Sequence, residues 1–213
     1  MYTKAEENYI KSVYHLQRVN KNVGTNELAA LLQTKAASVT DMFKKLEAKK
    51  LLTYQKYYGC RLTTAGRKVA LSIIRRHRLW EYFLVQTLGF GWEEVHDIAE
   101  QLEHIQSPAL IEKLDAFLGS PSFDPHGDPI PDKTGNISEM PWQNLGMAPV
   151  GKMLEIMAVS NQTPTMLEML GSRQLGIGTK LTIQQRFAFD SSVEVETEKR
   201  VIHHLSERLA KEV

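Results

Sequence analysis

Hydrophobic and polar positions in the first third of the chain follow a helical spacing three times and then change period. Residues 5–19 and 36–50 each carry one apolar face, and between them Thr25 is the predicted N-cap of the helix "NELAALLQ". In "LLTYQKYYGCRLTT", β-favouring residues flank Gly59, which is typical of a hairpin. The order helix, helix, short turn, helix, hairpin predicts a winged helix-turn-helix.

The helical spacing returns from Thr64 through "AGRKVALSIIRRHRLWEYFLVQTL" and again in "WEEVHDIAEQLEHI". Ser107 and Pro108 then begin a further predicted helix, "ALIEKLDAFLG". Residues 119–149 hold most of the prolines, including "SPSFDPHGDPIP", which predicts an ordered or loosely tethered linker. Beyond it, "KMLEIMAVS", "TKLTIQQRFAF" and "SSVEVET" are predicted as short strands and "VIHHLSERLAKEV" as a closing helix, which indicates a small β-barrel-like domain.

Charge is distributed unevenly along the chain, although the net charge is only +1. Residues 1–76 contain 15 Lys and Arg against 5 Asp and Glu, whereas residues 77–213 contain 11 against 20. The basic third favours an anionic partner such as nucleic acid, and the acidic remainder can hold cations. No segment has the roughly 18 continuous apolar residues of a membrane span. The lack of a secretory signal and the single cysteine, Cys60, indicate a reducing cytoplasm.

Residues 36–50 form the predicted recognition helix of the helix-turn-helix. Small and polar residues in its first turns let a helix enter a major groove closely, and later lysines and the hairpin wing can reach phosphates. The alternative is a helical scaffold with a solvated lysine face, but helix order, hairpin and positive charge together favour DNA. The candidate DNA contacts are Ala36, Ala37, Ser38, Thr40, Lys44, Lys45, Tyr57 and Arg61.

Histidines and glutamates gather in "HDIAEQLEH", where four of them fall within roughly 100° around a helix axis. Upstream, "HRLWE" places His77 and Glu81 one turn apart on a second helix. Imidazole nitrogens and carboxylate oxygens suit a divalent transition metal such as Mn, Fe, Co or Zn, while the alternative is a solvated polar face. We expect His15 and His126 to be structural or exposed, and His203 and His204 to lie on a solvated terminal helix.

With these motifs in view, the chain resembles the diphtheria-toxin-repressor family of metal-dependent transcriptional regulators over nearly its whole length. The resemblance rests on "EENYIKSVYHL", "AASVTDMFKKLEAKKLL", "LTTAGRKVA", "RRHRLWEYFL", "EEVHDIAEQLEH" and "DPHGDPIP" in this order. It implies a mainly α protein with a winged helix at 1–73, a helical metal-binding and dimerisation domain with a Pro-rich linker at 74–140, and an SH3-like domain at 150–213. It also implies a homodimer that binds a palindromic operator when loaded with metal.

The resemblance assigns two metal sites. The ancillary site matches His77, Glu81 and His96, and the helix ligands of the primary site match Glu100, Glu103 and His104. Where the family pattern offers Met or Asp near the first helix, this chain has Asn8, whose amide oxygen is a weaker ligand. Lys11 stands where members with a close two-metal centre carry a second acidic residue, and Asn161 or Gln162 are the weak candidates from the C-terminal domain.

The leading hypothesis is a cytoplasmic, homodimeric repressor of metal-ion uptake that is activated by Mn²⁺ or, alternatively, Fe²⁺. The sequence has no Gly-rich phosphate loop, no GxSxG elbow and no HExxH motif, so we do not expect an enzyme. Two alternatives stay open: a metal-storage or delivery protein, and a constitutive DNA binder whose metal is structural. We expect the two-fold interface to use part of the apolar stripe Trp92, Val95, Leu102, Leu110 and Leu114.

Overall fold

The computed structural model describes residues 2–138 and 141–213, and these divide into two compact units. The first unit comprises residues 2–77, 100–117 and 131–137. The second comprises residues 78–99, 118–130, 138 and 141–213. Helices α4 (Thr64–Gln86) and α5 (Val95–Leu102) contribute residues to both units.

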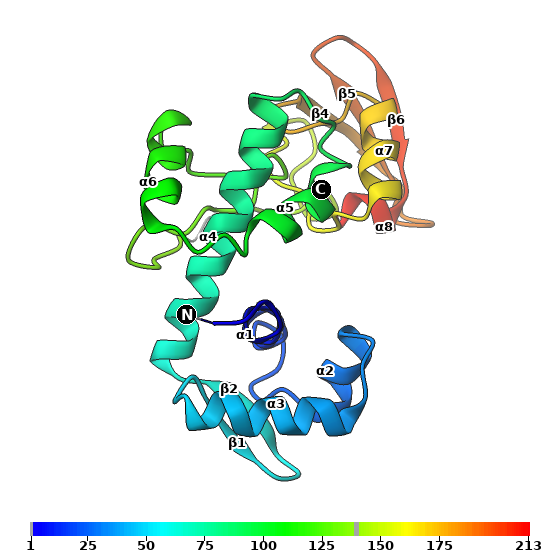
Figure 1. Ribbon diagram of the computed structural model, residues 1–213. Coiled ribbons are helices and arrows are strands. Elements are labelled where there is room, and N and C mark those ends of the chain that lie inside the picture. The colour runs from blue at the N-terminus through cyan, green and yellow to red at the C-terminus, as the bar shows by residue number, and fades with distance from the viewer. Residues whose placement is uncertain (1, 139–140) are drawn as a thin grey trace. The chain divides into compact units, whose positions relative to one another are not determined.

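The first unit contains the predicted winged helix-turn-helix (Figure 1). Its elements are α1 (Lys4–Leu16), α2 (Thr25–Leu31), α3 (Ala36–Ala48), β1 (Leu52–Gln55) and β2 (Gly59–Leu62). Thr3 caps α1 through a capping box with Glu6. The predicted N-cap of α2 is wrong by one residue: Gly24 is the cap, and its backbone N–H donates to Glu27.

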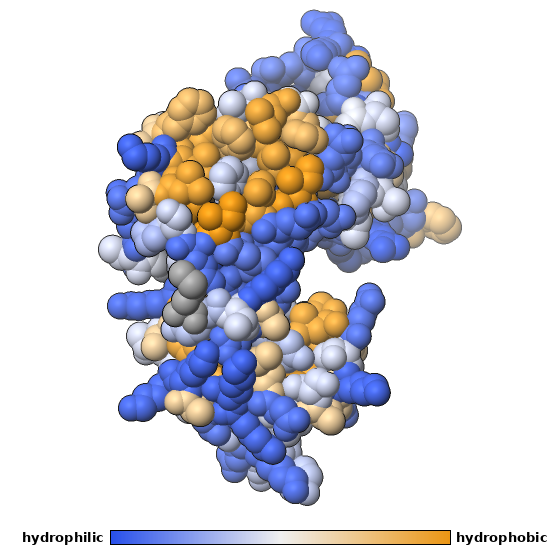
Figure 2. Space-filling model, viewed as in Figure 1, coloured by the Kyte–Doolittle hydropathy of each residue, from blue (hydrophilic) through white to orange (hydrophobic). Residues whose placement is uncertain are grey.

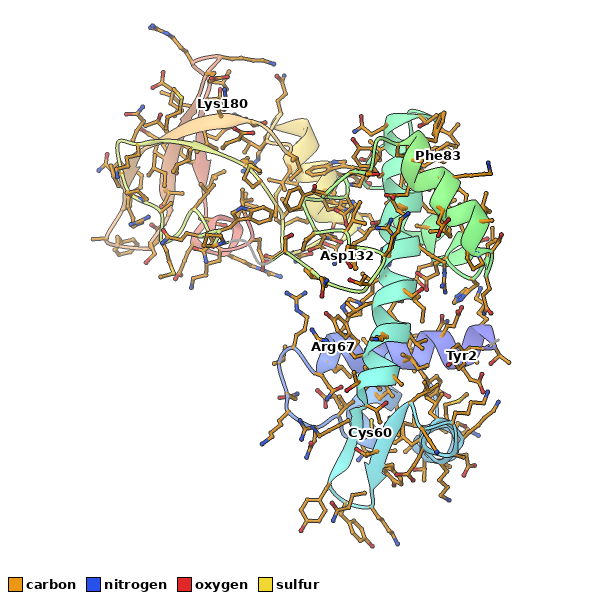
Figure 3. The ribbon with its side chains drawn as sticks, turned by 90° about the vertical axis from the view of Figure 1, so that its left-hand side faces the viewer. Tyr2, Cys60, Arg67, Phe83, Asp132 and Lys180 are labelled. Carbon is orange, nitrogen blue, oxygen red and sulfur yellow. The ribbon has the colours of Figure 1, made fainter. Side chains whose placement is uncertain are left out.

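The apolar faces of these elements meet in one core. Its members with no exposed surface include Ile10, Val13, Leu28, Val39, Phe43 and Leu46, which come from α1, α2 and α3. Cys60 of β2 is buried and exchanges two backbone hydrogen bonds with Val23, which places the Val23 segment beside the hairpin (Figure 3). A side chain at position 59 would lie 2.3 Å from the Val23 carbonyl oxygen, and the backbone φ there is +89°. Only glycine fits that approach.

Helix α6 (Pro108–Phe117) completes the helical part of the first unit. Figure 2 shows hydrophobic side chains gathered on one part of the surface. Within the predicted dimer stripe, Val95 and Leu114 are buried within the chain and Trp92 packs on the core of the second unit, whereas Leu110 stays exposed. The large apolar side chains left exposed on or near α6 are Ile105, Leu110 and Phe117.

The second unit is built on an antiparallel sheet in the order β3–β4–β5–β6. Its strands are β3 (Met153–Glu155), β4 (Lys180–Arg186), β5 (Val193–Thr197) and β6 (Ile202–Leu205), and its helices are α7 (Pro164–Ser172) and α8 (Glu207–Ala210). The first three strands confirm the sequence prediction of a small β domain. The predicted closing helix is wrong, since "IHHL" pairs with β5 and only four residues after it are helical. Helix α7 was not predicted.

The proline-rich stretch contains neither helix nor strand within residues 119–138 and 141–149. Part of it is nevertheless firmly packed: Asp124, His126 and Ile130 are buried, and Phe123 and Pro129 form an isolated bridge. The sequence predicted either an ordered or a loosely tethered linker, and residues 123–130 are ordered. Within the part of the chain that the structure describes, no helix is both long and apolar enough to cross a membrane.

Candidate metal centre and nucleic-acid interface

Glu103 is the centre of a buried ionic cluster in the first unit. Helix α5 ends at Leu102, so Glu103 and His104 lie in the turn that follows and not on the predicted helix. Nδ1 of His77 lies 2.7 Å from Glu103 Oε2, and Nζ of Lys11 lies 2.7 and 2.8 Å from the two carboxylate oxygens. Burial alone raises the pKa of Glu103, but the His77 imidazole and the Lys11 ammonium outweigh it and hold the pKa below its usual range.

The imidazole ring of His104 is held by Glu7 of α1. Nδ1 of His104 lies 2.6 Å from Glu7 Oε2, and Glu7 also accepts a hydrogen bond from Arg76 at 2.7 Å. With its proton on Nδ1, the imidazole presents the lone pair of Nε2, which is buried without a hydrogen-bond partner 3.7 Å from Glu103 Oε1. A carboxylate that fixes the far nitrogen of an imidazole is the usual outer support of a metal-binding histidine.

Asn8 of α1 is a further candidate ligand. Its Oδ1 is also buried without a hydrogen-bond partner, and it precedes Lys11 by three residues, which places both side chains on one helix face. A buried oxygen that accepts no hydrogen bond reduces the stability of the fold unless a cation or a water molecule binds it. The orphaned atoms of Asn8 and His104, together with the Glu103 carboxylate, therefore fit an oxygen- and nitrogen-ligated divalent metal.

A second cluster lies in the other unit, around Glu81 of α4. Donor atoms of Glu81, Asp124 and His126 all lie within 4.8 Å of one another, and all three residues are buried. Nε2 of His126 lies 2.8 Å from the Trp92 carbonyl oxygen, so a proton there leaves Nδ1 with a free lone pair. That Nδ1 has no hydrogen-bond partner and lies 3.8 Å from Glu81 and 3.9 Å from Asp124. This trio also fits a divalent cation.

Charge in the second cluster is poorly compensated. Burial, together with Glu81 and Asp128, raises the pKa of Asp124 to about 7, against the opposing charges of Arg78 and His126. Burial lowers the pKa of His126, but the neighbouring Glu81 and Asp124 carboxylates outweigh it and raise the pKa overall. A buried carboxyl that prefers its proton near neutral pH indicates a site that lacks a positive charge.

Sequence reasoning missed Asp124 and His126. Asp124 was not considered and His126 was expected to be structural or exposed, because "DPHGDPIP" was interpreted as a linker. The signal was present as Asp124-Pro-His126, two donors separated by one residue in a turn-forming segment. Local patterning could not show that this turn is buried beside Glu81.

The other predicted ligands have definite neighbours. His96 is half exposed, with its Nδ1 3.5 Å from Glu81 Oε1. Glu100, on α5, contacts Lys11. The weak candidates from the C-terminal part lie elsewhere: Asn161 accepts hydrogen bonds from Thr163, and Gln162 donates to Asp128 at 3.3 Å.

The candidate DNA surface is formed by α3 and the hairpin, where the surface in Figure 2 is mainly hydrophilic. Thr40 is partly buried and donates to the Ala36 carbonyl oxygen at 3.0 Å. Tyr57 is 90% exposed at the tip of the wing. The remaining candidates are exposed: Ala36, Ala37, Ser38, Lys44, Lys45 and Arg61.

Buried Glu6 of α1 connects this surface to the first helix. Its Oε1 lies 3.0 Å from Lys45 and 2.7 Å from Lys49. Burial alone raises the pKa of Glu6, but hydrogen bonds from Lys49, the Thr3 backbone and Lys45 outweigh it and lower the pKa to about 2. Helix α1 thus contacts the recognition helix through Glu6 and the Glu103 cluster through Glu7 and Lys11.

Two family models match this chain. Residues 1–60 match the N-terminal DNA-binding domain of the iron dependent repressors. Residues 63–132 match their metal-binding and dimerisation domain. Both clusters and the α3 surface lie within these matched ranges.

Individual relatives agree with the models. The chain is 33% identical over 125 residues to the iron-dependent repressor IdeR of Mycobacterium leprae, covering 59% of this chain and 54% of that protein. It is 33% identical over 114 residues to the HTH-type transcriptional regulator MntR of Bacillus pumilus, covering 54% and 78%. The chain spans about half the length of the first of these curated relatives.

Solved structures extend the likeness to the C-terminal part. A manganese-dependent transcriptional repressor in complex with manganese superimposes with a TM-score of 0.83 at 32% identity, covering 97% of each chain. ScaR with bound Cd²⁺ superimposes with a TM-score of 0.77 at 32% identity, covering 97% of this chain and 96% of the other. The predicted fold class, a winged helix followed by a helical domain and a small SH3-like β domain, is confirmed.

Proposed function

Because this chain belongs to the family of iron-dependent and diphtheria toxin repressors, we propose that it is a metal-activated transcriptional repressor of metal-uptake genes. It is a regulator and not an enzyme. The activating ion is Mn²⁺, with Fe²⁺ as the alternative, since the similar structures include a manganese-dependent repressor and the relatives include an iron-dependent one. It acts in the cytoplasm, where its operator lies.

One observation carries the proposal: His104 Nε2 is buried, lacks a hydrogen-bond partner, and lies 3.7 Å from Glu103 Oε1. Asn8, Glu103 and His104 would hold the activating metal, with Glu100 at the edge of the cluster. When bound, such an ion supplies two positive charges at the junction of α1 and the turn after α5. Glu7 orients the His104 ring, and the absence of a thiolate among these donors favours Mn²⁺ or Fe²⁺ over softer ions.

Helix α1 couples the metal centre to the DNA surface. Its Lys11 contacts Glu103 of the cluster, while Glu6 holds Lys45 and Lys49 of α3. Fixing α1 against the turn after α5 therefore also fixes the recognition helix. In a two-fold homodimer this would set both recognition helices to the half-site spacing of a palindromic operator.

Glu81 anchors the ancillary site in this proposal. The resemblance assigns it His77 and His96 as partners, whereas we propose Asp124 and His126, whose donor atoms lie within 4.8 Å of a Glu81 carboxylate oxygen and of each other. The buried pair is the stronger choice, because His126 Nδ1 has no hydrogen-bond partner among the described residues and the pKa of Asp124 is raised despite the nearby Arg78. An ion here would stabilise the second unit and tune the response.

The test is metal-dependent binding to a duplex selected from a random library in the presence of Mn²⁺. We expect fluorescence anisotropy under anaerobic conditions to show affinity at least about 10–100-fold higher with Mn²⁺ or Fe²⁺ than with chelator. Affinity should also fall steeply with salt as phosphate contacts are screened. Mn²⁺ uptake without selection of any duplex would indicate a storage or delivery protein and overturn the proposal.

A second candidate, a constitutive DNA binder with a structural metal, is favoured by one contact. Lys11 already joins α1 to Glu100 and Glu103 without metal. Equal operator affinity in chelator and in Mn²⁺ would support this alternative.

A further inference from the structure

The Lys11 side chain occupies the point at which carboxylates converge in the first unit. Its Nζ contacts both oxygens of Glu103 and one oxygen of Glu100. The Lys11 side chain is 11% exposed, and that of Glu103 is fully buried. An ammonium group has three N–H donors and no acceptor, so these three contacts use its whole donor capacity.

The same two carboxylates belong to a group that could hold a metal ion. Donor atoms of His77, Glu100 and Glu103 lie within 4.8 Å of one another. A divalent cation bound by this group would stand beside the Lys11 ammonium, and two cations at such close range repel each other. The chain's own cation therefore competes with a metal for this group.

We propose that Lys11 is a resident cation, which takes the place of a metal ion among His77, Glu100 and Glu103 and ties α1 to α5 before any metal binds. This inference rests on the proposed function, because it concerns the same metal centre. It also restricts the junction to one metal, held by Asn8, Glu103 and His104. Glu103 can serve both roles, since an ionised carboxylate has about four lone-pair positions.

Two consequences follow for the protein without metal. Glu103 keeps a charge partner, so the first unit stays stable in chelator. Lys11 already connects α1 to α5 before metal binds. Metal therefore binds to a conformation that resembles the metal-bound form.

The experiment compares the full-length protein with Lys11→Met, which removes the charge at similar length, and Lys11→Arg, which keeps it. Lys113→Met on α6 is the matched control, because it removes one exposed lysine from the same unit. Equilibrium dialysis gives the number of Mn²⁺ ions per subunit, and Mn²⁺ electron paramagnetic resonance detects spin coupling between close ions. Thermal unfolding in chelator gives the stability of the metal-free state.

We expect Lys11→Met to bind one more Mn²⁺ per subunit than wild type, with a spectrum broadened by coupling. Its thermal midpoint in chelator should fall by several degrees and recover with Mn²⁺. Lys11→Arg and Lys113→Met should match wild type in both measurements. If Lys11→Met does not fold in chelator, Lys11→Gln purified with Mn²⁺ provides the same ion count.

An equal Mn²⁺ count in wild type and in the neutral variants overturns the inference, as does an unchanged midpoint in chelator. Failure of the proposed function has a different signature, because wild type itself would then show no Mn²⁺-dependent duplex binding whatever the ion count of the variants.

Discussion

The two buried carboxylate clusters differ in how the chain compensates their charge. Around Glu103, the fixed cations Lys11 and Arg76 lie close to the carboxylates, and the pKa of Glu103 is lowered. In the other cluster, the fixed cation Arg78 lies beside Asp124, yet the pKa of Asp124 is raised to about 7. Both clusters contain an imidazole nitrogen without a hydrogen-bond partner, in His104 and in His126.

A bound metal ion would therefore have a different effect in each cluster. In the first cluster the carboxylates already have fixed cations beside them, so a metal would mainly contribute geometry through His104 and Asn8. In the second cluster a metal would supply missing charge and thereby stability. The clusters should therefore respond differently to loss of a ligand, to pH and to chelation.

The largest expected effect is the loss of activation in His104→Ala. Removing an outer partner of a metal ligand typically costs about 10–100-fold, and removing the ligand itself should cost more than about 100-fold in Mn²⁺-dependent operator affinity. His126→Ala should weaken the response by only about 10-fold, because its cluster lies in the other unit. Anisotropy titration with the selected duplex measures both.

His15→Ala is the control for that pair, since His15 is exposed on α1. Full Mn²⁺-dependent binding by His104→Ala would reverse the comparison and move the activating site to the second cluster.

The second effect is a fall in metal-free stability with rising pH. A carboxyl whose pKa rises from 3.8 in the unfolded chain to about 7 in the fold binds more protons when folded, so stability declines between those pH values. The raised pKa of His126 acts in the same direction. We expect a decline of about 2 kcal/mol, less than the roughly 4 kcal/mol of an isolated group, because the carboxylates titrate together.

Urea unfolding in chelator at several pH values between 4.5 and 7.5 measures this decline. Asp124→Asn should flatten it, and Mn²⁺ should remove it in wild type. If the free energy of unfolding of Asp124→Asn declined with pH as steeply as that of wild type, the negative charge of the second cluster would be compensated in the fold.

A smaller effect of opposite sign comes from Glu6. Its pKa is lowered to about 2 from 4.5, so its contribution is fully present above pH 4.5 and is lost as pH falls towards 2. Because Lys45 and Lys49 are partly exposed, we expect Glu6→Gln to cost about 1–2 kcal/mol at pH 6 and little at pH 2. Urea unfolding checks this, with the exposed Glu112→Gln as control. An equal loss at both pH values would exclude the ionic cause.

The smallest effect concerns Asn8. An uncharged amide is a weak ligand, so Asn8→Ala should weaken Mn²⁺ binding by only about 3–10-fold, whereas Asn8→Asp should strengthen it through added charge. Isothermal titration of Mn²⁺ measures both variants. Tighter binding by Asn8→Ala would mean that the unpartnered Oδ1 does not face the metal.

Local patterns were sufficient for the winged helix. Apolar spacing located α1, α2 and α3, and Gly59 between β-favouring residues located the hairpin, since these signals act within a few residues. The predicted N-cap of α2 was wrong by one residue, because both Thr25 and Gly24 are acceptable N-cap residues. The hydrogen bond between the Gly24 backbone N–H and the Glu27 side chain makes Gly24 the N-cap.

Local patterns failed where pairing partners decide the structure. "VIHHLSERLAKEV" has a helical spacing, yet Ile202–Leu205 form β6 because β5 offers them an open edge. The apolar spacing placed Trp92 and Val95 on an interface stripe, but Trp92 packs against the core of the second unit and Val95 is fully buried. Tertiary contacts outweigh weak local preference in short segments.

By itself, the sequence determined the order of the elements in the winged helix, the basic recognition surface, and the residue types that converge on a divalent metal. Only the tertiary structure decided which of those residues meet. It placed Lys11 on carboxylates 89 and 92 positions away, and it buried the Asp124–His126 turn beside Glu81. The physical reason is that ligand types and helical faces are properties of short segments, whereas charge compensation depends on which distant segments are buried together.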